Sequence, residues 1–462
     1  MITSLQIRNF KGWSDTGSLR LAPITVFFGT NSSGKSSLGQ FLMMLKQTAS
    51  SPDRGQVLHP GDGSTAVDLG TMEDLIHLHD PSKQLQFELR WKMSPYLEIK
   101  DAIAVTSFKG SELEFGATIG FDTARGTHAQ CRRFAYKFVG DGDSQFGAGM
   151  VPNPKEPGRF QLETTGIAMV RKTGRAWPLP HPLKFFGFPD EVARYYQNAE
   201  ELGDLTFSLQ SLFRGVSYLG PLRAEPRRHY SWAGDTPEDV GTRGERWVSA
   251  FLSGAKRKIS LGYKQKAKTF ETLIAAELLR LGLIHSFTVV PLAKGVREYR
   301  VRVRVKQGSP EVYIPDVGFG VSQVLPVVVQ CFYAPANSTV VIEQPELHLH
   351  PAIQQNLADL FISAVHARED GEDRNVQFLI ESHSEHFLRR LQRRIAEGQI
   401  KDRDVAIYFC DATRKGSSIT PLQLDMFGHI QNWPRDFFGD QMTDIAEMQK
   451  AMMNRQTDTP AA

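Results

Sequence analysis

Residues 29–36, GTNSSGKS, constrain the fold of this chain more than any other segment. They match the pattern GxxxxGK[ST], in which glycines permit a tight turn and backbone N–H groups face a phosphate at a helix N-terminus. The apolar run at 24–28 before the loop is typical of a strand buried on both faces. After the loop, apolar residues recur at i, i+3, i+4 and i+7 over 38–45, as on one face of a helix. We therefore predict a strand, a phosphate-binding loop and a helix.

Each part of this loop has an expected role. Lys35 is expected to reach the β- and γ-phosphates of ATP, and the Ser36 hydroxyl to ligate Mg²⁺. The alternative, a glycine- and serine-rich loop that matches by chance, fits poorly because both flanking segments are correct. The other nucleotide-binding positions that we predict here are Gly29, Asn31, Ser32, Ser33, Gly34 and Ser37.

Three later segments add the other parts of such a site. The apolar run 340–343 ends at Glu343, and a second apolar run ends at Glu381 and leads into a polar turn with His383. A glycine-rich turn at 316–323 enters an apolar helix. A buried strand that ends in an acid is common, so the acidic segment counts mainly in combination with the other two.

In this order the segments resemble ATP-binding-cassette (ABC) ATPases, and more narrowly their RecF/SMC-like and OLD-like branch. The resemblance is carried by NFK at 9–11, QPELHLHP at 344–351 and SHS at 382–384. It implies an α/β fold: an ABC-type P-loop ATPase head with a mixed-sheet lobe and a parallel α/β core, a helical insertion and a small C-terminal cap. It also implies a dimer that sandwiches two ATPs, each capped by the glycine-rich signature of the other subunit.

The resemblance assigns roles by position. Glu343 takes the place of the acid beside Mg²⁺, and Gln344 stands where these ATPases have the catalytic Glu. His350 aligns with an aspartate of the loop that crosses the dimer interface, and His383 with the histidine that senses the γ-phosphate. Because a neutral amide cannot act as a general base, Glu343 or Glu346 must activate water, or hydrolysis is slow. A purely structural hydrogen-bonded role is the alternative for His383.

The signature turn is also carried over from the resemblance. Gly318 and Gly320 align with the signature's Ser and second Gly; in the alternative, shifted register, Ser322 would be the γ-phosphate ligand. Without Ser at 318 the signature loses one hydroxyl contact. ATP binding is therefore better supported by the sequence than fast turnover.

A longer resemblance covers residues 218–226, 240–245 and 416–455. It is to one bacterial family of such ATPases with a small C-terminal domain of unknown function. Members often occur beside nucleases or other effectors in phage-defence gene clusters, in the manner of the Septu and Gabija ATPases. No fused Toprim nuclease fits after residue 410, so we expect a nuclease partner to be a separate protein. Arg223 or Arg243 could reach nucleotide or partner, and the sequence leaves this open.

The segments imply four regions. We predict an N-terminal ATPase lobe at 1–180, a helical insertion at 181–290, a C-terminal ATPase lobe at 291–410 and a small C-terminal domain at 411–462. The three cysteines form no CxxC pair, which fits a reducing compartment without a disulfide framework or zinc site. No signal core and no run of 18 apolar residues occurs, so we expect a cytoplasmic chain that does not enter a membrane.

The formal charge of +3 names no partner, so a nucleic-acid role must rest on local patches. The basic stretch 256–268 is the best candidate for DNA contact, with a solvated loop as the alternative. Residues 299–305 alternate, with three arginines on one face. We interpret them as a phosphate track or, more simply, a solvated edge strand.

Together these features predict an ABC-type ATPase that binds ATP and Mg²⁺. We expect it to pair as a homodimer or higher homo-oligomer through the ATP sandwich, and to control an effector or nuclease in anti-phage defence. Two alternatives remain. One is a DNA repair or replication accessory ATPase that binds DNA directly, and the other is a slowly hydrolysing, nucleotide-locked scaffold, which Gln344 favours.

Overall fold

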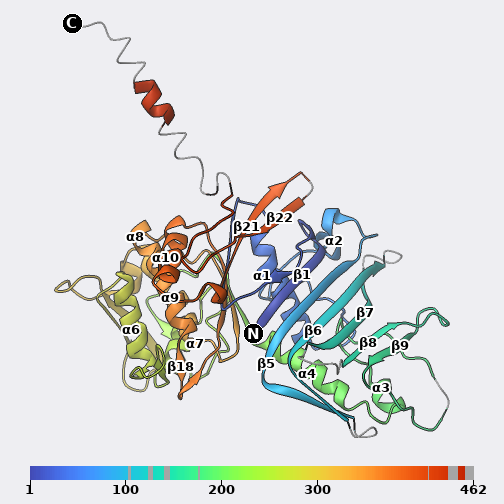
Figure 1. Ribbon diagram of the computed structural model, residues 1–462. Helices are drawn as coiled ribbons and strands as arrows, with labels where there is room; N and C mark the ends of the chain where they lie inside the picture. The colour runs from blue at the N-terminus through green and yellow to red at the C-terminus, as the bar shows by residue number, and fades with distance from the viewer. Residues whose placement is uncertain are drawn as a thin grey trace.

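A parallel sheet with helices on both faces stands beside a long antiparallel sheet (Figure 1). The antiparallel sheet and α4 lie on one side of the parallel core, and helices α6 and α8–α10 lie on the other (Figure 1). No helix in the described part of the chain is long and apolar enough to cross a membrane. The computed structural model describes residues 1–101, 106–122, 128–139, 146–174, 177–414, 416–434, 437 and 446–452, so the predicted C-terminal domain lies partly outside the described residues.

The core sheet has six strands in the order β10-β17-β20-β4-β21-β22. The first five run parallel, and β22 pairs antiparallel with β21. This confirms the parallel α/β core that the resemblance implies. The strands are β4 (Ile24–Gly29), β10 (Val216–Leu219), β17 (Thr339–Glu343), β20 (Gln377–Glu381), β21 (Val405–Thr413) and β22 (Gly416–Pro421).

Strand β10 lies inside the region expected to be a helical insertion, but it is the edge strand of the parallel core. Its four residues are too few to show a period in sequence. The same region does supply helices on either side of β10. They are α3 (Asp190–Tyr195), α4 (Glu201–Arg214), α5 (Trp247–Gly254) and α6 (Phe270–Leu281).

Alternate residues of the core strands face two separate hydrophobic clusters. In β17, Val341 packs in the first cluster with helix α1 (Lys35–Ser50), whereas Val340 and Ile342 pack in the second with helix α7 (Phe319–Tyr333). The same alternation holds in β20, where Leu379 belongs to the first cluster. Helices α1 and α7 therefore cover opposite faces of the sheet.

The N-terminal lobe is built on an eight-stranded antiparallel sheet that wraps around α1 (Figure 1). Aromatic side chains fill the space between this sheet and α1, as in the edge-on contacts of Phe41 with Phe10 and Phe87. The strands are β1 (Ile2–Phe10), β2 (Trp13–Asp15), β3 (Leu19–Arg20), β5 (Leu85–Asp101), β6 (Thr106–Asp122), β7 (His128–Val139), β8 (Gly147–Pro152) and β9 (Phe160–Thr165).

Two small sheets complete the second lobe. The arginine-rich strand β15 (Glu298–Arg304) lies between β14 and the pair β11 and β16, so the edge-strand interpretation of this segment was wrong. The other small sheet has the order β13-β12-β18-β19. Its strands β12 and β13 form a hairpin that carries the basic stretch 256–268. Their remaining strands are β11 (Tyr230–Ser231), β14 (Ser286–Pro291), β16 (Val312–Tyr313), β12 (Lys258–Ser260), β13 (Lys268–Thr269), β18 (Arg368–Glu369) and β19 (Glu372–Asp373).

A buried arginine closes the C-terminal end of α7. The Arg374 guanidinium donates to the carbonyl oxygens of Phe332 at 2.8 Å and Ala334 at 2.5 Å. These carbonyls have no partner inside the helix, so a cation placed there satisfies them and complements the helix dipole. Helices α8 (Pro351–Gln354), α9 (Asn356–Val365) and α10 (Glu385–Ala396) pack nearby, and the apolar side chains of α10 at 387, 388, 391 and 395 are buried.

Candidate functional site

The phosphate-binding loop joins β4 to α1, as predicted. Gly29 has φ +142°, and a Cβ there would lie 1.8 Å from the Cys410 carbonyl oxygen, so only glycine fits. Gly34 precedes α1 in the left-handed region at φ +89°. Asn31 and Ser32 are exposed at the tip of the loop, where the first turn of α1 presents backbone N–H groups without intrahelical partners.

Lys35 curls back over its own loop. Its ammonium donates to the Thr30 carbonyl at 2.7 Å and to the Gly29 carbonyl at 3.2 Å. Burial lowers the pKa of this lysine. The ammonium thus stands over the loop cradle, where a bound phosphate would replace the two carbonyls as its partner.

The two serines that follow differ in role. The Ser36 hydroxyl donates to Glu381 Oε2 at 2.7 Å. The Ser37 hydroxyl instead donates to the Gly34 carbonyl at 2.6 Å and accepts from the Trp13 indole N–H at 2.8 Å. Ser37 is buried, so the structure places its side chain in the packing beneath the loop and not among its exposed groups.

Glu343 is held at the end of β17 by two residues near β10. The Tyr218 hydroxyl donates to Glu343 Oε1 at 2.7 Å, and the Arg223 guanidinium donates to the Glu343 carbonyl at 3.0 Å. Burial, and next the charge of Glu381, raise the pKa of Glu343 to about 7. Burial lowers the pKa of Arg223 to about 10. Arg223, which the sequence left between nucleotide and partner, therefore contacts the acidic strand.

Glu346 and His383 meet at a backbone contact. The His383 N–H donates to Glu346 Oε1 at 2.6 Å, and the buried Glu346 Oε2 has no hydrogen-bond partner in the described residues. Burial raises the pKa of Glu346. The His383 residue is exposed as a whole, yet partial desolvation of its ring, and next the charge of Lys35, lower its pKa. A neutral imidazole beside the loop can donate to or accept from a phosphate oxygen.

Within one chain, the signature turn and the phosphate loop lead into helices that cover opposite faces of the core sheet. Gly318 precedes α7, which covers the face opposite α1. Ser322 is buried and donates to the Phe319 carbonyl at 2.7 Å. Gly320 is close to the acidic-strand loop, since a Cβ there would lie 2.9 Å from the His348 carbonyl.

The loop after β17 reverses sharply. Gln344 has φ +45°, and its N–H donates to the Glu381 carbonyl at 2.8 Å. His350 is exposed and caps α8, where its Nδ1 accepts from the Ala352 N–H at 3.2 Å. Neither His348 nor His350 belongs to a metal cluster, because the described residues hold no group of three or more His, Cys, Asp and Glu side chains placed for one.

Sequence reasoning missed Glu381 and Tyr218 as members of this site. Glu381 ends a strand as Glu343 does, and that parallel was the available signal. Tyr218 lies on the short strand β10, which no periodicity revealed.

The oxygen donors at this position suit a divalent cation. A serine hydroxyl lies between two buried carboxylates, and hydroxyl and carboxylate oxygens are the ligands that Mg²⁺ prefers. The Ser36 hydroxyl, together with one or both of the carboxylates of Glu343 and Glu381, would hold the ion. Predicted residues 29–36 and Glu343 are thus brought together, with Glu346 and His383 beside them.

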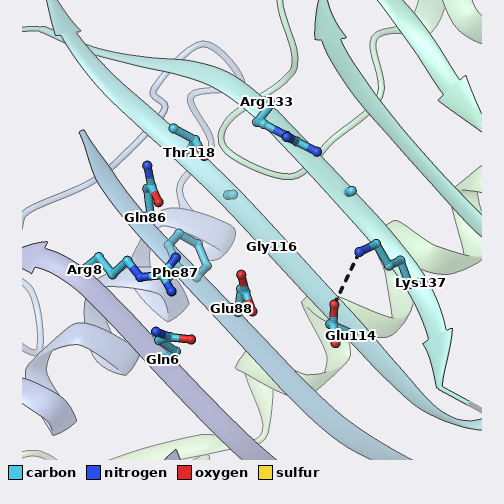
Figure 2. A pocket seen from close by; sticks show the side chains of 12 residues that line it. Gln6, Arg8, Gln86, Phe87, Glu88, Glu114, Gly116, Thr118, Arg133 and Lys137 are labelled. Carbon is cyan, nitrogen blue, oxygen red and sulfur yellow. Dashed lines mark ion pairs between the residues drawn. The ribbon is translucent and has the colours of Figure 1, made fainter. Parts of the chain in front are cut away.

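A separate hollow of about 210 Å³ lies on the outer face of the antiparallel sheet, across β1, β5, β6 and β7 (Figure 2). Lys137 pairs there with Glu114 at 3.7 Å, and Arg90, outside the lining, pairs with the same carboxylate at 2.7 Å. The lining mixes acids and bases over Gly116, so its charge favours no particular ligand.

Three protein-family models match the chain. "AAA ATPase domain" matches residues 1–119, and "AAA domain, putative AbiEii toxin, Type IV TA system" matches 189–389. A protein of unknown function, DUF3696, matches 400–448. No curated protein matches the sequence.

Solved structures similar to the chain include heads of SMC proteins. The SMC head domain from Thermotoga maritima has 9% identity and a TM-score of 0.41, covering 92% of this chain and 99% of that one. The Smc head from Pyrococcus furiosus, bound to the C-terminal domain of ScpA, has 10% identity and a TM-score of 0.42, covering 98% and 99%. The two ATPase-domain models span both the loop at 29–36 and the segment from Tyr218 to His383, and they support an ATPase.

Proposed function

We propose that this chain binds Mg²⁺·ATP at the loop 29–36 and hydrolyses it. One observation carries the proposal: Lys35 and Ser36 stand at the start of α1, directly beside the buried carboxylates of Glu343 and Glu381. A cradle of backbone donors, a lysine and a hydroxyl next to buried acids is what phosphate and its cation require together. The cation neutralises charge on the phosphates, and Lys35 exchanges its loop carbonyls for phosphate oxygens.

Glu346 is the group that we assign to water activation. Its Oε2 is buried without a partner in the described residues, and its Oε1 is fixed by the His383 backbone. Glu343 fits this role less well, because one of its oxygens accepts from Tyr218. A carboxylate oxygen without a partner can accept a proton from water, and the raised pKa of Glu346 makes it a stronger base. His383 would then contact the γ-phosphate.

We further propose that ATP pairs two copies of the chain head to head. Helices α1 and α7 cover opposite faces of the core, which supports a nucleotide contact of the turn at Gly318 and Gly320 with a second copy and not with its own phosphate loop. Phe319, between these glycines, is 46% exposed and packs edge-on against His348, which leaves an aromatic surface for that copy to cover. The paired state would control an effector or nuclease in anti-phage defence, as the family resemblance implies.

The test measures ATP affinity and mass together. Wild-type chain should bind a fluorescent ATP analogue and double its mass by light scattering when ATP and Mg²⁺ are added. Lys35→Ala loses a charge-assisted contact worth about 2 kcal/mol, so its affinity should fall about 30-fold. Phe319→Asp should keep nucleotide binding but remain a monomer, and exposed Lys294→Ala is the matched control. A Lys35→Ala chain that binds ATP normally and pairs would refute the proposal.

A second candidate function, direct DNA binding, is favoured by the hairpin 256–269. Its lysines at 256, 258, 264, 266 and 268 are all exposed, whereas the ion pairs of this sheet use Arg257 and Arg368. Tyr263 is 72% exposed at the tip, a position suited to stacking. The arginines of β15 are more occupied, since Arg300 contacts Tyr313 and Arg304 pairs with Glu311 at 3.6 Å.

DNA binding by the hairpin predicts a steep salt dependence. Anisotropy of labelled duplex DNA should show at least tenfold weaker binding when the lysines at 264, 266 and 268 are changed to Glu, and little change for Lys294→Glu. Equal binding by both variants would exclude the hairpin as the contact surface.

A further inference from the structure

Two carboxylates lie side by side at the carboxyl edge of the core sheet. Strands β17 and β20 are parallel neighbours, and Glu343 and Glu381 are directly opposite each other in their register. Each lies two residues after a side chain of the first cluster, Val341 and Leu379. Because side chains of a strand alternate between faces, both carboxylates point toward α1. Both are buried, at 5% and 8% exposure.

The protein provides little positive charge to balance them. The Lys35 ammonium donates to backbone carbonyls of its own loop, and Arg223 donates to the Glu343 carbonyl instead of its carboxylate. Within the described residues neither carboxylate has a Lys, Arg or His nitrogen in ion-pair contact. Buried charges are normally paired or bound to metal. The pair therefore fits a cation that comes from solution.

The hydrogen bonds separate the roles of the two acids. One oxygen of Glu343 accepts from Tyr218, and the backbone of Glu343 is fixed by Arg223. Glu381 instead accepts from the Ser36 hydroxyl, the side chain of the phosphate loop on the cation side. Burial raises the pKa of Glu343 and a hydrogen bond from Ser36 partly offsets that rise, but the direct 2.7 Å contact with the loop belongs to Glu381.

We propose that Glu381, with Ser36, holds a hard divalent cation, and that Glu343 is the neighbouring acid that Tyr218 positions. The proposal rests on the proposed function, because the cation accompanies ATP. The main acidic ligand of the cation is then Glu381, at the end of β20, and not Glu343, at the end of β17. Carboxylate and hydroxyl oxygens select Mg²⁺ or Mn²⁺ over softer metals.

The test uses Mn²⁺ as the probe, with the full chain and a saturating non-hydrolysable ATP analogue. Free Mn²⁺ is followed by electron paramagnetic resonance. In Glu381→Gln the Mn²⁺ concentration for half-saturation should rise at least tenfold, and in Glu343→Gln by less than that. The exposed Glu372→Gln on β19 is the matched control and should match wild type.

Binding of the analogue without metal separates this proposal from the proposed function. Glu381→Gln should bind it as well as wild type or more tightly, because one negative charge near Lys35 is removed. A wild-type chain that binds no analogue with or without metal would refute the proposed function. Wild-type Mn²⁺ affinity in Glu381→Gln would overturn the role of Glu381 alone. If that variant does not fold, Glu381→Asp and Ser36→Ala decide the question, since each should weaken Mn²⁺ binding at least threefold.

Discussion

Replacing Glu343 by Gln should stabilise the nucleotide-free chain at alkaline pH and do little at acid pH. Burial raises the pKa of this carboxyl from 4.5 to about 7. Between these two values the folded chain keeps the proton and the unfolded chain has released it. Stability therefore falls as pH rises through this interval, and the penalty is complete above pH 7.

The size of the effect follows from the shift. A difference of about 2.5 pKa units corresponds to about 3 kcal/mol, of which about 2.5 kcal/mol falls between pH 5 and pH 8. For a chain of 462 residues the unfolding entropy makes this about 2 to 3 °C in Tm. Glutamine keeps an oxygen for the Tyr218 hydroxyl but has no charge to bury.

The assay is thermal unfolding of wild type and Glu343→Gln at both pH values, with EDTA present so that no cation compensates the charge. The Tm of the variant minus that of wild type should be 2 to 3 °C larger at pH 8 than at pH 5. Exposed Glu372→Gln should show no such change. A Tm difference for Glu343→Gln that is equal at both pH values would show that Glu343 is not held protonated by burial.

Three further changes test other parts of the structure. Glu346→Gln should lower phosphate release about 100-fold while ATP affinity stays within threefold, and unchanged turnover would assign water activation elsewhere. Gly29→Ala should cost about 3 kcal/mol or more and abolish nucleotide binding, because its Cβ would overlap the Cys410 carbonyl; normal binding in a titration would contradict this. Arg374→Met should lower Tm by about 3 to 5 °C, since removing the buried cation leaves the helix carbonyls that it caps without a partner; an unchanged melting curve would show that the cap is dispensable.

Local pattern was enough to predict the parts of the site that depend on neighbouring residues. The glycines of the loop, the apolar run of β4 and the helical period of α1 are all set within residues 24–50, so the motif located them correctly. The strand that ends in Glu343 could be predicted for the same reason. Its burial on both faces required an unbroken apolar run, which the sequence shows.

The rest of the site depends on how strands pair, and the sequence does not show that. Glu381 meets Ser36 because β20 lies between β17 and β4 in the sheet. Tyr218 meets Glu343 because β10 is the next strand beyond β17. Ser37 is withdrawn from the loop by an indole on β2, in a different sheet. Each of these contacts joins segments that are far apart in the chain, so no local period predicts them.

The glutamine at 344 can be understood from the same contacts. Glu343, Glu346 and Glu381 are already buried here, and the nearest buried cations, Lys35 and Arg223, donate to backbone carbonyls. A fourth carboxylate, at 344, would add like charge next to Glu343 and raise the cost of burial further. If Glu381 serves the cation and Glu346 the water, the two tasks fall to acids at the end of β20 and in the loop after β17. A neutral residue at 344 is then compatible with hydrolysis, and it avoids adding a further negative charge to a site that must also accept the phosphates of ATP.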